Sequence, residues 1–178
     1  VTWSGNRFVA VGWAGTILSS IDGVSWASSS SGTGESLWGV TWGGGQFVAV
    51  GGPGTILTST DGTAWISRSS GTTDSLNCVA WSGNQFVAVG GSGSLNLSSA
   101  RILTSADGIT WTSRISGAPY LRSVMWSGSQ FFAVGLDGTF WTSADGITWA
   151  SRGGWGGSRG VTSGGGKYVV VGRISDYS

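Results

Sequence analysis

The stretch TSADGITW occurs twice in this chain, at residues 104–111 and again at residues 142–149. Close variants stand at Ser19–Trp26 (SSIDGVSW) and Thr58–Trp65 (TSTDGTAW). An Asp-Gly pair flanked by β-forming residues is a strong signal for the turn of a β-hairpin. The fourfold recurrence therefore predicts the same hairpin in four successive units of the chain.

The hairpin belongs to a longer repeat. Alignment on the tryptophan of phrases such as VTW places successive copies at Trp3, Trp42, Trp81 and Trp126, with Ser163 in a fifth copy. The intervals are 39, 39, 45 and 37 residues, and the longest interval holds an insertion at residues 92–100. A period near 40 residues is typical of stacked repeat architectures such as propellers.

Each unit divides into four short apolar runs, which in the second copy are Leu37–Trp42, Gln46–Gly51, Thr55–Ser59 and Ala64–Arg68. Four antiparallel strands in each unit of about 40 residues predict an all-β fold, a β-propeller of four-stranded blades. We expect one propeller domain over residues 1–178, with four complete blades and a partial fifth. The expected blades cover approximately residues 1–34, 35–73, 74–117, 118–157 and, for the partial one, 158–178.

Aromatic side chains recur at fixed places in the units, and they are predicted to fill the seams between blades. A single small sheet exposes both of its faces, so neighbouring blades must cover them by packing face to face. The recurring tryptophans of the first strand and phenylalanines of the second are Trp3, Trp42, Trp81, Trp126, Phe8, Phe47, Phe86 and Phe131. Large aromatic rings bury much apolar area, which suits this packing.

The repeated phrase S/T-x-D-G-x-x-W resembles the Asp-box of bacterial-neuraminidase-type repeats, although it is one residue shorter than the usual S-x-D-x-G-x-x-W. The resemblance implies a propeller blade with the box on the turn between its third and fourth strands. The structural box residues are Asp22, Gly23, Trp26, Asp61, Gly62, Trp65, Asp107, Gly108, Trp111, Asp145, Gly146 and Trp149. The aspartates can accept backbone hydrogen bonds within the turn. The alternative, a catalytic or calcium-binding role, conflicts with their identical repetition on every blade, which spreads them apart.

The resemblance also raises the question of sialidase or glycosidase activity, and the residues argue against an enzyme. Glycoside hydrolysis needs paired carboxylates or, in sialidases, a tyrosine nucleophile. Glu35 is the single glutamate, and Arg68, Arg114 and Arg152 occupy equivalent places on separate units. There is no histidine to act as an acid or base. With a single cysteine, Cys78, the sequence also lacks zinc and haem motifs, so no metal and no cofactor is expected.

The composition of the chain excludes some classes of partner. Charged residues make up 10% of the chain and the formal net charge is +1, so the basic surface of a nucleic-acid binder is missing. The apolar runs are too short for a membrane span. From the low charge and the abundant Ser, Thr and Gly we expect an extracellular or periplasmic setting. If one chain does not close the ring, the open sheet faces predict a homo-oligomer.

The units differ mainly in the loops of one propeller face, formed by the second-to-third strand turns and the connections between units. Loops on a rigid scaffold commonly carry recognition, and Trp, Tyr and Arg are enriched in binding hot spots. The candidate ligand-binding residues on this face are Trp13, Trp38, Tyr120, Arg122, Trp155 and Arg159. They predict a non-enzymatic scaffold that binds a protein partner, as in photosystem-assembly factors with similar repeats. A glycan-binding, lectin-like propeller is the alternative, and drift in unconstrained loops is the other explanation of the variation.

Overall fold

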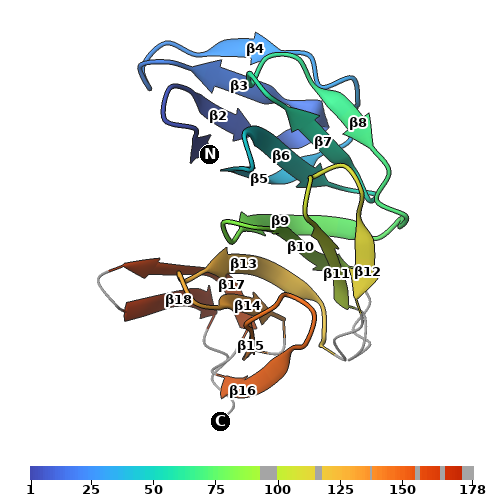
Figure 1. Cartoon of the computed structure of the whole chain (residues 1–178), viewed down its shortest axis with the longest axis vertical. Helices are drawn as coiled ribbons and strands as arrows, with labels where there is room; N and C mark the ends of the chain where they lie inside the picture. The colour runs from blue at the N-terminus through green and yellow to red at the C-terminus, as the bar shows by residue number, and fades with distance from the viewer. Residues whose placement is uncertain (93–99, 115–117, 137, 155–156, 165–166, 174–178) are drawn as a thin grey trace.

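The computed structural model describes residues 1–92, 100–114, 118–136, 138–154, 157–164 and 167–173. Over these residues the chain is all β apart from one short 3-10 turn, η1 (Trp13–Gly15). The strands form five antiparallel sheets that follow one another in chain order along an arc (Figure 1). No helix in the described part of the chain is long and apolar enough to cross a membrane.

The first sheet consists of β1 (Thr2–Trp3), β2 (Phe8–Val11), β3 (Ile17–Ser20) and β4 (Ala27–Ser29). The second consists of β5 (Leu37–Gly43), β6 (Gln46–Gly51), β7 (Ile56–Ser59) and β8 (Ile66–Arg68). The third consists of β9 (Ser75–Trp81), β10 (Phe86–Gly91), β11 (Ala100–Ser105) and β12 (Thr112–Arg114). The fourth consists of β13 (Leu121–Trp126), β14 (Phe131–Gly135), β15 (Thr139–Ser143) and β16 (Ala150–Gly154). The fifth consists of β17 (Gly157–Gly164) and β18 (Lys167–Arg173).

Each sheet is a meander in which consecutive strands pair antiparallel. In the second sheet, for example, Ala49 on β6 stands opposite Val40 on β5 and Leu57 on β7. The first strand of each unit is the innermost one, because β1, β5, β9, β13 and β17 contact one another in that order. The four complete sheets and the shorter fifth sheet agree with the strand pattern that the repeats predict.

The core lies in the seams between consecutive sheets. Each seam brings alternate residues of the second strand of one sheet against the aromatic face of the next. In the seam between the second and third sheets, Val48 and Val50 are fully buried beside Phe86, with Trp81 and Trp111 packed at the edges. The first and third seams repeat this arrangement around Phe47 and Phe131. Packing of aliphatic side chains of one sheet against the aromatic rings of the next therefore forms the core of the fold.

The phenylalanine of each complete sheet lies between two tryptophans of its own sheet. Phe86 has the Trp81 ring at 4.4 Å and the Trp111 ring at 6.3 Å, measured between centroids. The equivalent rings of the first, second and fourth sheets lie at 4.2 to 4.7 Å and at 6.3 Å. This row of three rings runs along one face of the sheet, and in the second, third and fourth sheets the preceding sheet covers it.

Candidate functional site

A β-bulge recurs at the start of the innermost strand in every sheet from the second to the fifth. The pairing register shifts between Leu37 and Gly39, between Leu121 and Ser123, and between Ser158 and Gly160. In the third sheet the same shift falls opposite Val89 and Gly90. The residues that the pairing skips are Trp38, Asn77, Arg122 and Arg159.

The four bulged residues occupy equivalent positions in the repeat. The residue type at this position varies among the copies, as Trp, Asn or Arg. A bulge leaves one residue out of the ladder and changes the direction in which its side chain points. The inner strands that carry them contact one another in order. The fold therefore offers a fixed row of variable side chains, one on each sheet.

Trp38 forms an exposed aromatic pair with Trp13 of the preceding sheet. The two ring centroids are 6.2 Å apart and the rings meet edge to face at 77°. Trp13 is 77% exposed and Trp38 is 47% exposed. Edge-to-face packing holds two rings against each other, but it leaves most of this apolar area in water.

The turn that carries Trp13 has an unusual backbone. Ala14 adopts φ 51° and ψ 40°, and it is the one non-glycine residue with positive φ in the described part of the chain. Two backbone hydrogen bonds fix the turn on either side: Thr16 donates to the carbonyl of Trp13, and Leu37 donates to the carbonyl of Gly12. A left-handed conformation at a residue with a side chain is costly and persists only where the surroundings determine it.

Tyr120, Arg122 and Asn77 form a second group on the same loop face. The Tyr120 hydroxyl donates to Oδ1 of Asn77 at 3.0 Å, and the Asn77 amide donates to the carbonyl of Leu121 at 2.7 Å. The Arg122 guanidinium lies over the Tyr120 ring, 5.6 Å from its centroid. The Nε atom of Arg122 is buried and has no hydrogen-bond partner among the described residues.

The structure thus joins the candidate residues into two contacts. Trp13 touches Trp38, and the Tyr120 ring lies under Arg122 while its hydroxyl bonds to Asn77. Asn77 was absent from the predicted binding set, although its place in the repeat was the available signal. Arg159 is exposed on β17, and Trp155 lies outside the described residues.

The Asp-Gly hairpins lie between the third and fourth strands of the first four sheets. In the third sheet, Oδ1 of Asp107 accepts the backbone N–H groups of Thr110 and Ile109, at 2.8 and 2.9 Å, and the hydroxyl of Ser105 at 3.0 Å. These bonds to the charged form hold the pKa of Asp107 at about 2, below its ordinary 3.8, with the Thr110 N–H as the largest cause.

The other three hairpins follow the same scheme. Asp22 has a pKa of about 2 for the same reason, and the pKa values of Asp61 and Asp145 are also lowered by backbone hydrogen bonds. All four carboxylates bond within their own turns. Each aspartate is thus used by its own hairpin.

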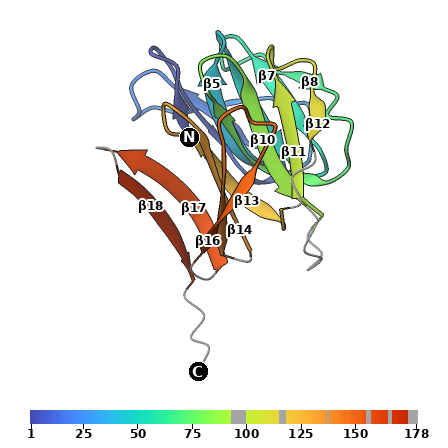
Figure 2. The same ribbon diagram turned by 60° about the horizontal axis from the view of Figure 1, so that its bottom comes forward.

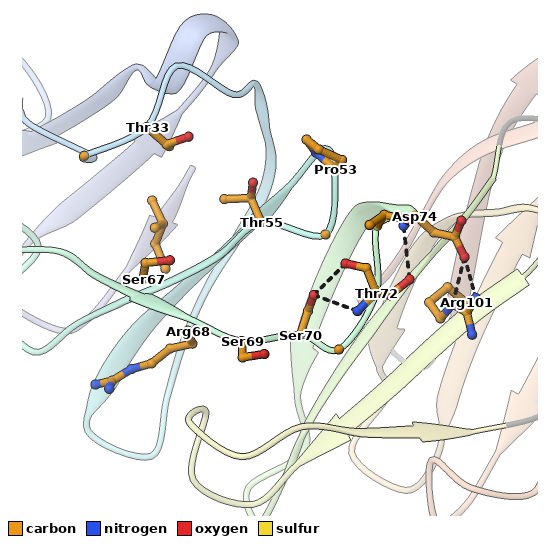
Figure 3. A pocket seen from close by; sticks show the side chains of 15 residues that line it. Thr33, Pro53, Thr55, Ser67, Arg68, Ser69, Ser70, Thr72, Asp74 and Arg101 are labelled. Carbon is orange, nitrogen blue, oxygen red and sulfur yellow. Dashed lines mark hydrogen bonds and ion pairs between the residues drawn. The ribbon is translucent and has the colours of Figure 1, made fainter.

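A polar hollow of about 740 Å³ lies on the outer part of the loop face (Figure 3). Its walls carry hydroxyls of several serines and threonines, together with Arg68 and the ion pair Arg101–Asp74. Both Nε and Nη2 of Arg101 donate to Oδ2 of Asp74, at 2.9 and 2.5 Å. Sequence reasoning missed this hollow, because its glycines, serines and threonines are typical of any loop and only the fold brings the three connections together.

The repeated arginines and the glutamate do not form a cluster. Arg68, Arg114 and Arg152 each donate from Nε to a threonine hydroxyl on the neighbouring strand of their own sheet, at 2.9 to 3.0 Å. Glu35 is exposed in the connection before β5. Among the described residues, no group of three His, Cys, Asp or Glu side chains gathers in a way that could hold a metal ion.

Comparison with known proteins places the fold. No protein-family model matches the sequence, and no curated protein matches it. Among solved structures, "YCF48 bound to D1 peptide" matches with a TM-score of 0.65 and 19% identity, over 89% of this chain and 53% of that one. "Crystal Structure of Mitotic Checkpoint Complex" matches with a TM-score of 0.66 and 13% identity, over 90% of this chain and 53% of that one. The chain therefore spans about half the length of these two structures, and the likeness confirms the predicted β-propeller fold.

Proposed function

We propose that this chain is a non-catalytic binding module that recognises a protein partner through its variable loop face. The contact residues are Trp13, Trp38, Tyr120, Arg122 and Arg159. The observation that carries the proposal is the exposed pair Trp13–Trp38, in which one ring stands on a bulged strand and the other on a strained turn.

The physical argument concerns what these rings do in the absence of a partner. Two tryptophans that are 77% and 47% exposed leave a large apolar area in water. Burying that area against a partner is favourable, and tryptophan and arginine are the residue types most enriched among binding hot spots. Because the edge-to-face contact already holds the two rings against each other, part of their conformational entropy is lost before binding.

Arg122 adds a polar element to the same face. Its guanidinium is held by the Tyr120 ring, and its Nε atom lacks an acceptor among the described residues. Because Nε is buried, a carbonyl or carboxylate of a partner would have to meet the guanidinium at its terminal N–H groups. Aromatic anchors beside a fixed guanidinium are the composition expected of a protein-binding surface.

The structural neighbours are consistent with this assignment. One of them, YCF48, has a D1 peptide bound, and the other belongs to the mitotic checkpoint complex. Sequence identities of 19% and 13% support the fold, so the binding property is argued from the surface of this chain.

The test uses a random peptide library, since the partner is unidentified. Phage-displayed peptides are selected on the immobilised chain, and the Kd of the best peptide is measured by calorimetry for each variant. We expect Trp13→Ala and Trp38→Ala each to weaken Kd by about 30-fold, which corresponds to a hot spot of about 2 kcal/mol. Ile66→Ala is the matched control, because Ile66 is an exposed apolar residue on the outer strand β8. Peptides that bind the Trp13→Ala/Trp38→Ala double variant as tightly as the unmodified chain would refute the proposal.

A glycan ligand is the second candidate, and the polar hollow favours it. Serine and threonine hydroxyls, among them Thr33, Thr55 and Thr72, line the hollow together with Arg68, and the space is large enough for a small sugar. A glycan array distinguishes the two functions. Binding that Arg68→Ala abolishes and Trp13→Ala leaves unchanged would assign the activity to the hollow.

A further inference from the structure

The contact between consecutive sheets is the same in three places within the chain. We call the side of a sheet that carries the Trp–Phe–Trp row its rear face, and the opposite side its forward face. In each seam the forward face of one sheet meets the rear face of the next. The forward residues are Val9 in the first seam, Val48 and Val50 in the second, and Val87 and Val89 in the third, all of them fully buried.

Two further contacts recur in these seams. The hairpin glycines Gly62, Gly108 and Gly146 sit against Val9, Val48 and Val87 of the preceding sheet. In the second seam the side-chain amide of Gln46 donates to the carbonyl of Asp107, and in the third seam that of Gln85 donates to the carbonyl of Asp145. Each seam thus has valines on one side and a ring row and a hairpin on the other, and the second and third seams add a glutamine donor.

The rear face of the first sheet is complete but uncovered. Trp3 is 44% exposed and Trp26 is 39% exposed, and Phe8 between them is partly exposed, whereas its equivalents in the next three sheets are buried. A Cβ added to Gly23 would meet only the Phe8 ring of its own sheet. This sheet therefore presents a whole seam surface with nothing against it among the described residues.

The forward face at the other end of the arc is also uncovered. Val169 and Val171 on β18 occupy the positions of Val48 and Val50 in the repeat, and they are 52% and 58% exposed. Lys167 occupies the position of Gln46 and is exposed. Figure 2 shows β17 and β18 at the edge of the molecule, with one side open.

We propose that a second copy of this chain docks its first sheet on the fifth sheet of the first copy, and so repeats the internal seam between molecules. The two open surfaces are complementary because they carry the ring row and the valine row of a contact that the chain makes three times within itself. The internal seams also use an isoleucine of the third strand, whereas the described part of the fifth sheet offers β17 and β18. Lys167 carries the donor that Gln46 supplies internally, and the carbonyl of Asp22 takes the place of that of Asp107. This interface is formed by the faces of the first and fifth sheets, and the proposed ligand-binding surface by loops and bulged residues, so neither proposal depends on the other.

The contact is head to tail, so it predicts a specific pattern of association. Each copy keeps one open surface of each kind, and such interfaces give closed rings or longer assemblies.

The experiment measures mass in solution by light scattering after size exclusion, with two blocking variants. Trp3→Asp blocks the rear face and Val171→Asp blocks the forward face. We expect the unmodified chain to form assemblies at multiples of 18.1 kDa and each variant alone to be monomeric. An equimolar mixture of the two variants should give a dimer, because each supplies the surface that the other lacks.

The controls make every outcome decisive. Ile66→Asp places a charge on an exposed position of the second sheet, away from both surfaces, and should assemble as the unmodified chain does. The near-ultraviolet circular dichroism of the tryptophans verifies that each variant is folded. A monomeric unmodified chain overturns the proposal. So does a mixture of folded variants that stays monomeric, and so does a Val171→Asp chain that still dimerises, since the contact would then be symmetric.

Discussion

The side-chain amide of Gln85 donates a hydrogen bond of 2.7 Å to the backbone carbonyl of Asp145, sixty residues further along the chain. It ties the second strand of the third sheet to the hairpin of the fourth. Gln46 makes the same bond to Asp107 across the preceding seam. Gln130 stands at the equivalent place in the fourth sheet, but the described part of the fifth sheet consists of β17 and β18 and contains no Asp-Gly hairpin for it to reach.

This difference gives a matched pair of substitutions. We expect Gln85→Ala to lower the free energy of unfolding by about 0.5–1.5 kcal/mol, the usual net value of one hydrogen bond. Gln130→Ala removes the same side chain where no such bond exists and should change stability by less than about 0.5 kcal/mol. Urea denaturation followed by tryptophan fluorescence measures both. Equal losses in the two variants would show that the bond contributes nothing to the seam.

The hairpin aspartates predict a dependence of stability on acid. The pKa of Asp107 is about 2 in the folded chain, whereas an unfolded aspartate titrates near 3.9. A carboxylate with a depressed pKa stabilises the fold fully above the unfolded pKa, and this stabilisation is lost as the pH falls from about 4 toward 2. Asp22, with a pKa of about 2, acts in the same direction.

The measurement is the urea midpoint between pH 7 and pH 2. The four hairpin aspartates should leave this midpoint unchanged down to about pH 4, and below that pH the midpoint should fall. Asp107→Asn keeps an oxygen that can accept both turn hydrogen bonds but cannot titrate, so its fall should be shallower than that of the unmodified chain. Parallel pH profiles for the two proteins would contradict the assignment.

The second seam predicts an unusual cost for a single methyl group. A Cβ on Gly43 would overlap the ring of Trp81 in the next sheet, whereas a Cβ on Gly34 would meet nothing within 4 Å. Neither glycine has positive φ, so the comparison concerns space alone. We expect Gly43→Ala to destabilise the chain by about 1–3 kcal/mol through overpacking, and Gly34→Ala to have little effect. Thermal unfolding measures the difference, and an unchanged midpoint for Gly43→Ala would mean that the seam can open to admit the methyl group.

The strands and their order were predictable because the pattern is local. Asp-Gly turns and runs such as Phe47–Val50 recur in every complete unit, and they specify a hairpin or a doubly covered strand without knowledge of the neighbours. The partial exposure of Trp3 and Trp26 could not be predicted from the sequence. They occupy the same repeat positions as tryptophans that the preceding sheet covers, and only the spatial arrangement shows that no described sheet lies against the first one.

The candidate site was predictable as a set of residues but not as contacts. Variation among the copies singled out Trp38, Arg122 and Arg159, yet the bulge that excludes them from the pairing depends on strand register across the hairpin. The pairing of Trp13 with Trp38 depends on how far the second sheet is rotated from the first. The polar hollow depends on three connections that meet in space, and their serines and threonines resemble those of any loop.

Cys78 offers a probe of the third seam. Its Sγ–H donates to the carbonyl of Val124 in the next sheet at 3.4 Å, and desolvation by burial raises the pKa of the thiol above its usual range. Since the thiolate is the reactive form, a disulfide reagent at pH 8 should react far more slowly with the folded chain than with glutathione. When the chain is unfolded in concentrated urea, its labelling rate should be similar to that of glutathione. Gln85→Ala weakens the same seam and should therefore increase the labelling rate of the folded chain, whereas Gln130→Ala should not. Labelling of the unmodified folded chain as fast as that of glutathione would show that the thiol is open to solvent and that the seam around it is loosely packed.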